Sequence, residues 1–364
     1  MSLKSDQAAA IPAGVTLCSA IDNGFGPIEK PGASDNAREY LAAIACPHPR
    51  GGHLTGLNSC LNIAFPCGRI GAVSGFRDAG LRGGSSMIVD THLHVIDLSA
   101  LDYPWLAGKP ELNRPWSYRA YALEARRAGI TRALHMEVDV APDRIEDETG
   151  MVATLAAQPD SLIAGAIASC RPEDQGFTAY LERQRANPLV KGLRRVLHVM
   201  PDSLSEQPLF RENIARLSGT GLSFDLCVLP RQLPQAVALA DLAPDVHFIL
   251  DHCGVPDIKS DASQPWRTHI AEIAKRPNVT AKISGVVAYA DPESWIADTL
   301  RPWVEHTICS FGWDRVVWGS DWPVCTLGGG LLAWVAATHA LLEGASPDEK
   351  RKLLRGNAER IWSL

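Results

Sequence analysis

The sequence lacks several features that define whole classes of proteins. No segment approaches the ~20 consecutive apolar residues that a membrane-spanning helix requires. No Gly-x-Gly-x-x-Gly motif follows a strand-like segment, which argues against a dinucleotide-binding fold. The 35 Lys and Arg do not exceed the 41 Asp and Glu, and the net charge of -6 provides no basic surface for nucleic acid. These absences predict a protein whose partner is a small molecule rather than a membrane or a nucleic acid. A homo-oligomer is compatible with the same composition.

The cysteines also lack a recognisable pattern. There are nine, an odd number, and no two of them form a Cys-x-x-Cys pair. Structural thiols in a reducing compartment are the simplest explanation. The amino terminus has Lys4 and a short alanine run, but not the apolar core of a secretory signal. We therefore expect a cytoplasmic protein.

Residues 1–86 differ in composition from the rest of the chain. They are rich in turn-forming sequences, such as that of residues 22–27, and contain one convincing helical pattern near residues 37–45. We interpret residues 1–86 as a non-catalytic N-terminal extension and residues 87–364 as the catalytic domain. Three forms of this extension stay open: a disordered segment, a segment packed on the domain, or translated sequence upstream of a true start at Met87.

Apolar, strand-like segments alternate with amphipathic helical patterns from Met87 onward. The strand-like segments are residues 87–96, 131–138, 162–169, 190–197, 223–229, 247–254, 279–286 and 316–323. The helical candidates include residues 117–128, 145–157, 266–275 and 331–342. Near-continuous apolar strands separated by helices are typical of a parallel sheet covered by helices. Eight such units in about 280 residues predict an α/β protein with a (β/α)8 barrel of the TIM type.

Catalytic residues of such a barrel lie at the carboxyl ends of its strands. The first predicted strand carries His92 and His94, which share one face because they are two residues apart. The sixth ends near His252 and the eighth near Asp321. The structural alternatives are histidines satisfied by backbone partners and an aspartate that caps a helix. Together, the four residues predict a catalytic or metal-binding site.

Further residues near the same strand ends are candidates for substrate contacts. Arg194 and Arg195 are adjacent and face opposite ways in a strand, so at most one enters the barrel, and the sequence does not say which. A salt bridge to an acid such as Glu137 explains an inward arginine equally well. The other candidates are His198, Trp105 and Trp322. A solvated histidine and core packing are the alternatives for the first two of these.

These motifs together resemble those of a known family. They are Val-Asp-Thr-His-Leu-His (89–94), Tyr-Pro-Trp (103–105), Lys-Gly-Leu-Arg-Arg-Val-Leu-His (191–198), Leu-Asp-His-Cys-Gly (250–254), Lys-Ile-Ser-Gly (282–285) and Trp-Gly-Ser-Asp-Trp-Pro (318–323). As an ensemble they are similar to the amidohydrolase-related family of metal-dependent hydrolases. The likeness is greatest to its sugar-lactone hydrolase branch, which includes the L-fuconolactone hydrolases, and it extends from Met87 to about Trp362.

The resemblance implies a distorted (β/α)8 barrel that binds one or two divalent ions. The implied ligands are His92, His94, His252 and Asp321. The chain departs from the binuclear pattern, because its fourth strand offers arginines instead of a bridging Lys or Glu, and its fifth offers Asp225 instead of a histidine. The resemblance therefore implies one Zn²⁺ ion or a site that works without metal.

Lactone hydrolysis is the function that the resemblance implies. The reaction needs an activated water, a group that polarises the carbonyl and a proton for the leaving alkoxide. We expect Asp321 to act as the general base, and the three histidines to bind Zn²⁺ or donate hydrogen bonds to the carbonyl. One of the two arginines would orient a carboxylate or hydroxyl of a sugar-acid or related carboxylated lactone. A decarboxylase or an amide hydrolase on the same barrel is the alternative enzyme, and a non-catalytic binding protein is the alternative class.

Overall fold

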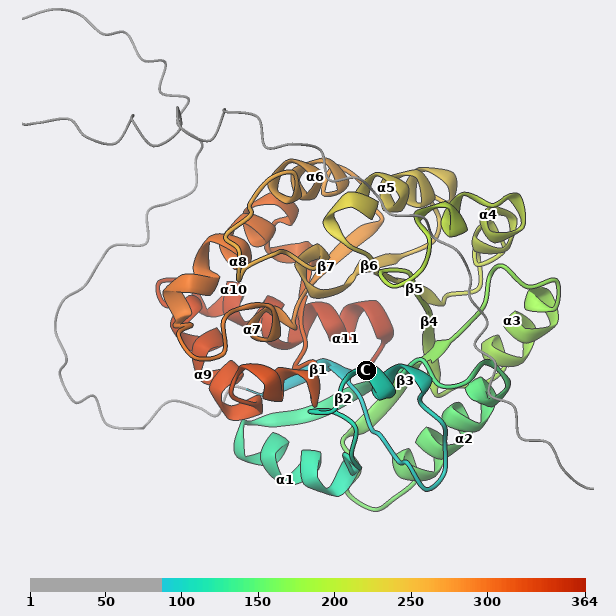
Figure 1. The fold of residues 1–364 in the computed structure, drawn as a ribbon, viewed down its shortest axis with the longest axis horizontal. Coiled ribbons are helices and arrows are strands. Elements are labelled where there is room, and N and C mark those ends of the chain that lie inside the picture. The colour runs from blue at the N-terminus through green and yellow to red at the C-terminus, as the bar shows by residue number, and fades with distance from the viewer. Residues whose placement is uncertain (1–86) are drawn as a thin grey trace, which may run out of the picture. The chain divides into compact units, whose positions relative to one another are not determined.

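The computed structural model describes residues 87–364, which form a (β/α)8 barrel with an inner ring of parallel strands and an outer ring of helices (Figure 1). The strands are β1 (Ile88–Leu93), β2 (Ile130–Met136), β3 (Ile163–Ser169), β4 (Val190–Val196), β5 (Ser223–Cys227), β6 (Phe248–Leu250), β7 (Val279–Ile283) and β8 (Val316–Trp318). The helices are α1 (Tyr118–Arg127), α2 (Ile145–Ala156), α3 (Phe177–Arg185), α4 (Pro208–Ala215), α5 (Leu233–Leu242), α6 (Trp266–Ile273), α7 (Val286–Tyr289), α8 (Ala297–Phe311), α9 (Leu331–Leu341), α10 (Pro347–Arg351) and α11 (Asn357–Trp362). The extension predicted for residues 1–86 lies outside the described residues. No helix of the described part is long and apolar enough to cross a membrane.

The eight strands pair in sequence order, each parallel to the next. The ring is nearly closed where the end of β1 meets the segment after β8, because Leu93 and Trp322 form a parallel bridge. The backbone N–H of His94 donates to the carbonyl of Trp322 at 2.7 Å, and that of Asp321 donates to the carbonyl of His92 at 2.8 Å. The predicted (β/α)8 barrel is confirmed, and its seam runs through four of the predicted site residues, His92, His94, Asp321 and Trp322.

The strands are apolar on both faces because each face packs against a different core. The larger core lies between the strands and the helices. The smaller one fills the barrel interior, and it consists of Val89, Leu134, Met136, Ile167, Ile249 and Val317 together with Ala358 and Trp362 of α11. The Trp362 indole donates to the Ser223 hydroxyl at 3.1 Å, and α11 lies across the ring of strands in Figure 1. Helix α11 is therefore an apolar floor beneath the barrel, opposite the carboxyl ends of the strands.

A side-chain cap and an apolar stripe together define some of the helices. Helix α1 is an example, because the Ser117 hydroxyl accepts a hydrogen bond from the backbone N–H of Ala120 at 3.3 Å. Its buried face presents Tyr121 and Ala125 to the barrel. The helix closes with Arg126 and Arg127, whose charges favour the carboxyl end of a helix.

The sixth and eighth strands are shorter than the sequence pattern predicts. β6 ends at Leu250 and is followed by a 3-10 turn, Asp251–Gly254, within which His252 and Cys253 both have φ of 53°. β8 ends at Trp318, and Asp321 has φ of 57°. A left-handed backbone cannot continue an extended strand. His252 and Asp321 therefore lie on turns just beyond the strands, not in them.

Candidate active site

The two histidines at the end of β1 lie side by side at the carboxyl end of the barrel. Their Nε2 atoms are 3.1 Å apart. The Nδ1 atom of His94 is 3.0 Å from the carbonyl oxygen of Met136 on β2, an atom that can only accept. The proton of a neutral His94 ring therefore lies on Nδ1, and Nε2 presents its lone pair to the site.

Asp321 and His252 complete the predicted group of four. The Oδ1 atom of Asp321 lies 3.4 Å from Nε2 of His94 and 3.7 Å from Nε2 of His92. The other carboxylate oxygen, Oδ2, faces His252, whose Nδ1 is 3.8 Å away. His252 also contacts the Ser284 hydroxyl, at 2.9 Å from Nδ1. The structure thus brings together residues that are 229 positions apart in the sequence, as the strand-end argument predicts.

A buried network of ions lies beneath these four residues, inside the barrel. The Lys282 ammonium is 2.7 Å from the Asp225 carboxylate and 2.8 Å from that of Asp251. The Arg194 guanidinium donates to Glu137 at 2.6 Å and lies 3.4 Å from Asp251. All five side chains are buried. Two cations and three carboxylates in such a place are tolerated only because each has an opposite charge beside it.

The charges of this network set the protonation of the groups around it. Burial acts to raise the pKa of Asp251, but the Lys282 ammonium outweighs it and holds that pKa well below its usual range. Burial raises the pKa of Asp225 to about 7, although the same ammonium opposes the shift. Burial, reinforced by Lys282, lowers the pKa of His92 well below its usual value, so this ring is neutral at pH 7. A neutral imidazole is the form that binds a metal ion or accepts a proton.

Three of the four predicted ligands have the spacing of a tetrahedral metal site. The Nε2 atoms of His92 and His94 and Oδ1 of Asp321 are separated by 3.1, 3.4 and 3.7 Å. Ligand atoms about 2.1 Å from a tetrahedral Zn²⁺ lie roughly 3.4 Å from one another. These buried side chains therefore fit one divalent ion. His252 lies next to this set and faces the other carboxylate oxygen of Asp321, Oδ2.

A second set, formed by His92, Asp251 and His252, is also close enough to hold an ion. However, the Lys282 ammonium lies 3.2 Å from Nδ1 of His92 and 2.8 Å from Asp251. A cation of the protein already occupies this side of His92, so this set does not fit a second divalent ion. This agrees with the sequence-based expectation of at most one metal ion.

A comparison with known protein families shows the family to which this chain belongs. A family model for amidohydrolases matches residues 89–364, the whole barrel. The chain belongs to the amidohydrolase family. It is therefore a hydrolase, and the barrel seen in the structure is the one that the family resemblance implied.

Relatives of this amidohydrolase include two named L-fucono-1,5-lactonase. That of Burkholderia multivorans is 30% identical over 292 residues, which cover 76% of this chain and 96% of the relative. That of Burkholderia ambifaria is 28% identical over 288 residues, which cover 76% and 95%. A crystal structure of an amidohydrolase from Burkholderia multivorans with bound zinc superposes with a TM-score of 0.70 and 26% identity, and covers 76% of this chain and 99% of that one.

The structure shows which arginine of this amidohydrolase faces the site. Arg194 points into the barrel, with one nitrogen 3.4 Å from Nε2 of His92, while its other nitrogens bond Glu137. Arg195 pairs instead with Glu173 at 2.7 Å. The salt bridge to Glu137, an alternative to substrate binding in the sequence, is thus present. Both guanidinium groups already have a carboxylate partner.

The remaining predicted contacts divide between the site and the core. His198 Nδ1 lies 3.1 Å from Cys227 Sγ, and burial together with Arg194 lowers the pKa of His198 to about 4. Trp105 is half-buried, and its indole donates to the carbonyl of Val138 at 2.7 Å. Trp322 is 1% exposed and packs against the rings of Trp116 and Tyr121, at 5.4 and 5.5 Å between centroids. The structure therefore places the Trp322 ring in the core.

The sequence pattern assigned no role to Asp251, which joins Lys282, Arg194 and His92. Asp90 on β1 supports the backbone of the site. Its Oδ1 accepts hydrogen bonds from the backbone N–H groups of His92 and Ser320 at 3.0 and 2.7 Å. A carboxylate in an otherwise apolar strand was the available signal, because such a group must be paired.

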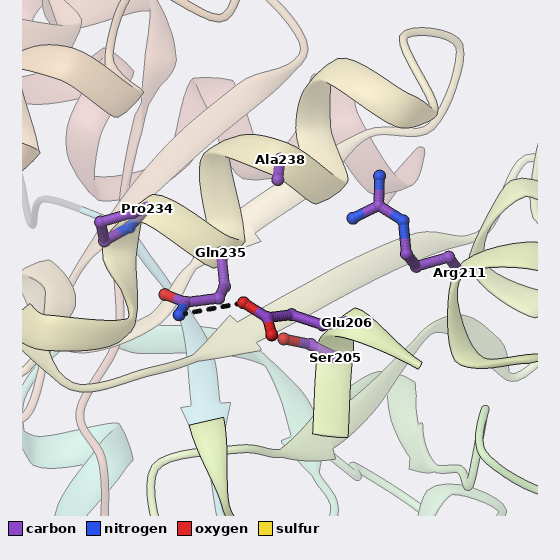
Figure 2. A pocket seen from close by; sticks show the side chains of 6 residues that line it. All are labelled: Ser205, Glu206, Arg211, Pro234, Gln235 and Ala238. Carbon is purple, nitrogen blue, oxygen red and sulfur yellow. Dashed lines mark hydrogen bonds between the residues drawn. The ribbon is translucent and has the colours of Figure 1, made fainter. Parts of the chain in front are cut away.

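A cleft adjoins the site on the side of His252. It has a volume of about 480 Å³ and is lined mainly by apolar groups, among them Leu229, Val255, Pro256 and Tyr289. A smaller hollow of about 170 Å³ lies between the 3-10 turn Asp202–Glu206, α4 and α5 (Figure 2). The smaller hollow is formed by the outer helical layer and is not part of the site. The larger cleft opens where the strands end, and its mainly apolar lining is typical of a pocket for a small molecule.

Proposed function

We propose that this amidohydrolase opens the ring of a small lactone by adding water to the ring carbonyl. The observation that carries the proposal is the convergence of Asp321 with three histidines at the mouth of the barrel, next to the cleft. The names of several relatives support it: L-fucono-1,5-lactonase, L-rhamnono-gamma-lactonase of Scheffersomyces stipitis and 4-sulfomuconolactone hydrolase of Rhizobium radiobacter.

The two oxygens of Asp321 suit two different tasks. Oδ1 faces Nε2 of His92 and His94, so these three groups would hold a divalent ion. A Zn²⁺ bound there would lower the pKa of a water and polarise a carbonyl. Oδ2 faces His252 and is free to accept a proton from the attacking water. Asp321 then returns that proton to the ring oxygen as the C–O bond breaks, which yields a hydroxy acid.

The charges around the site favour an uncharged lactone over a carboxylated one. Arg194 and Arg195 are each paired with a carboxylate, and Arg171 donates to Asp139 at 3.1 Å. No guanidinium group of these three is left to bind a substrate carboxylate without losing its present partner. A neutral sugar lactone, whose hydroxyls need only hydrogen bonds, therefore fits the site best.

The proposal is tested by screening a panel of sugar lactones and carboxylated lactones with a pH indicator, because ring opening releases acid. The screen is run with and without a chelator. Acid release by the wild-type protein supports lactone hydrolysis, and its loss after chelation, with recovery on adding Zn²⁺, supports a bound ion. Release of carbon dioxide from an aromatic acid would instead indicate the alternative reaction, decarboxylation. No turnover across the panel would contradict the proposal.

The Asp321→Asn variant tests the assigned base. Its amide cannot accept the proton of water, so we expect kcat to fall by about 10²- to 10⁴-fold. Thermal unfolding followed by circular dichroism should show that the variant is folded. Asp348→Asn, a change of the same kind at an exposed carboxylate on α10, is the matched control and should keep full activity. Near wild-type turnover by Asp321→Asn would remove this residue from the mechanism.

A further inference from the structure

Tyr289 lies at the junction of the site and the cleft. It is the last residue of α7, a short helix that begins directly after Ser284 and Gly285. Its ring packs edge-to-face against the His252 imidazole, with 6.2 Å between centroids and an angle of 82°. The same ring lines the cleft of about 480 Å³. A substrate in the cleft that reaches Asp321 and His252 therefore passes Tyr289.

The hydroxyl of Tyr289 differs from those of the other described tyrosines. Each of the other four has a protein partner: Tyr103 accepts from Asp97 N, Tyr118 accepts from Leu162 N, Tyr121 donates to Asp90, and Tyr180 donates to the carbonyl of Ser169. Within residues 87–364, no protein group forms a hydrogen bond with the hydroxyl of Tyr289. Tyr289 is half-buried, and its hydroxyl is not one of the fully enclosed polar atoms that lack a partner. A molecule in the cleft can therefore reach this hydroxyl and form a hydrogen bond with it.

The hydroxyl of a tyrosine is protonated at neutral pH, because a phenol ordinarily has a pKa of about 10. The Tyr289 hydroxyl is therefore available as a hydrogen-bond donor. A neutral donor is suited to a substrate oxygen that gains negative charge during the reaction.

We propose that Tyr289 is a further catalytic residue, whose hydroxyl donates a hydrogen bond to the carbonyl oxygen of the lactone as that oxygen becomes an oxyanion. This inference rests on the proposed lactone hydrolysis. The hydrogen bond is stronger in the tetrahedral intermediate than in the bound substrate, since the oxygen then carries a full charge. Its loss should consequently lower kcat more than it raises KM.

The test is the Tyr289→Phe variant, which keeps the ring against His252 and removes only the hydroxyl. We expect kcat to fall by about 10²- to 10³-fold, as for the loss of one oxyanion donor, with KM changed by less than about threefold. Tyr180→Phe, the same change at the outer helix α3, is the matched control and should keep wild-type kcat. Thermal unfolding of both variants verifies that they are folded. A full kcat for Tyr289→Phe, or an increase in KM alone, would overturn the proposal.

A second substrate tests the atom to which the hydroxyl donates. An activated aryl ester releases a phenolate that needs no proton, yet its carbonyl oxygen still becomes an oxyanion. The fold-loss in Tyr289→Phe should therefore be the same for this ester as for the lactone. A loss confined to the lactone would overturn the assignment to the carbonyl oxygen. Absence of turnover by the wild-type protein would overturn the proposed function itself, and this inference with it.

Discussion

Gly285 is the position at which one added methyl group should displace two residues of the site, His252 and Asp321. Its φ of 69° lies in the left-handed region, and a Cβ there would stand 2.6 Å from Nδ1 of His252 and 2.9 Å from Oδ2 of Asp321. To reach an ordinary contact of 3.4 Å, the imidazole must retreat by about 0.8 Å and the carboxylate by about 0.5 Å. Misplacement of reacting groups by about 1 Å can cost 10²-fold in rate. We therefore expect kcat/KM of Gly285→Ala to fall by about 30- to 100-fold.

The matched control is Gly219→Ala. Gly219 has nearly the same backbone, with φ of 73°, but nothing lies within 4 Å of its Cβ position. The cost of a left-handed alanine, about 1–2 kcal/mol of unfolding free energy, is common to both variants. Only Gly285→Ala adds the displacement of two site residues. Any difference in activity between the two variants consequently reports on the site rather than on backbone strain.

The assay is the initial rate of acid release on the best lactone of the panel, together with urea unfolding of both variants. Gly219→Ala should lose stability and keep kcat/KM, whereas Gly285→Ala should lose both. Equal activities of the two variants would refute the reasoning, because they would mean that the reaction tolerates a shift of His252 and Asp321. That result would also remove the main support for the proposed mechanism.

Two further predictions concern stability. Lys282→Met leaves the buried Asp225 and Asp251 with less opposite charge, so we expect the free energy of unfolding in urea at pH 7.5 to fall by about 3–5 kcal/mol. The double variant Lys282→Met/Asp225→Asn should lose less, because one of the two carboxylates is then neutral. A double variant less stable than the single one would contradict the pairing. Burial lowers the pKa of His135 to about 3, below that of the unfolded chain, so the neutral ring favours the folded state above pH 6.5 and this advantage is lost as pH falls towards 3. His135→Leu should reduce the slope of unfolding free energy against pH over this window by up to about 1.4 kcal/mol per pH unit, and an unchanged slope would rule out this origin.

The barrel and the four central residues of the site were predictable because both depend on local pattern. A strand buried on both faces is apolar throughout, so the hydrophobic pattern of the sequence is enough to predict the alternation of strands and helices. In a parallel barrel all carboxyl ends meet at one face, so His92 and Asp321 could be placed together without knowing any contact between them.

What could not be predicted depends on contacts between distant segments. Lys282 and Asp225 are 57 residues apart, and nothing local to either indicates the pairing. The orientation of Arg194 depends on the register between β3 and β4, which shifts within those strands. The left-handed turn at His252 was also not foreseeable, because a non-glycine residue adopts such a backbone only when its surroundings hold it there. The role proposed for Tyr289 could not be predicted either, because it depends on the position of the ring beside His252 and on a hydroxyl without a hydrogen-bond partner in the described part of the protein.

The floor of the barrel has a consequence for how the protein acquires its structure during synthesis. The interior side chains of the strands are all translated before α11, yet Ala358 and Trp362 cover them from below. Until these residues have emerged from the ribosome, the inner core is open to water at one end, and a nascent chain with all eight strands still exposes an apolar surface. Completion of the barrel is therefore a late event, governed by the last helix to be made rather than by the pairing of the last strand.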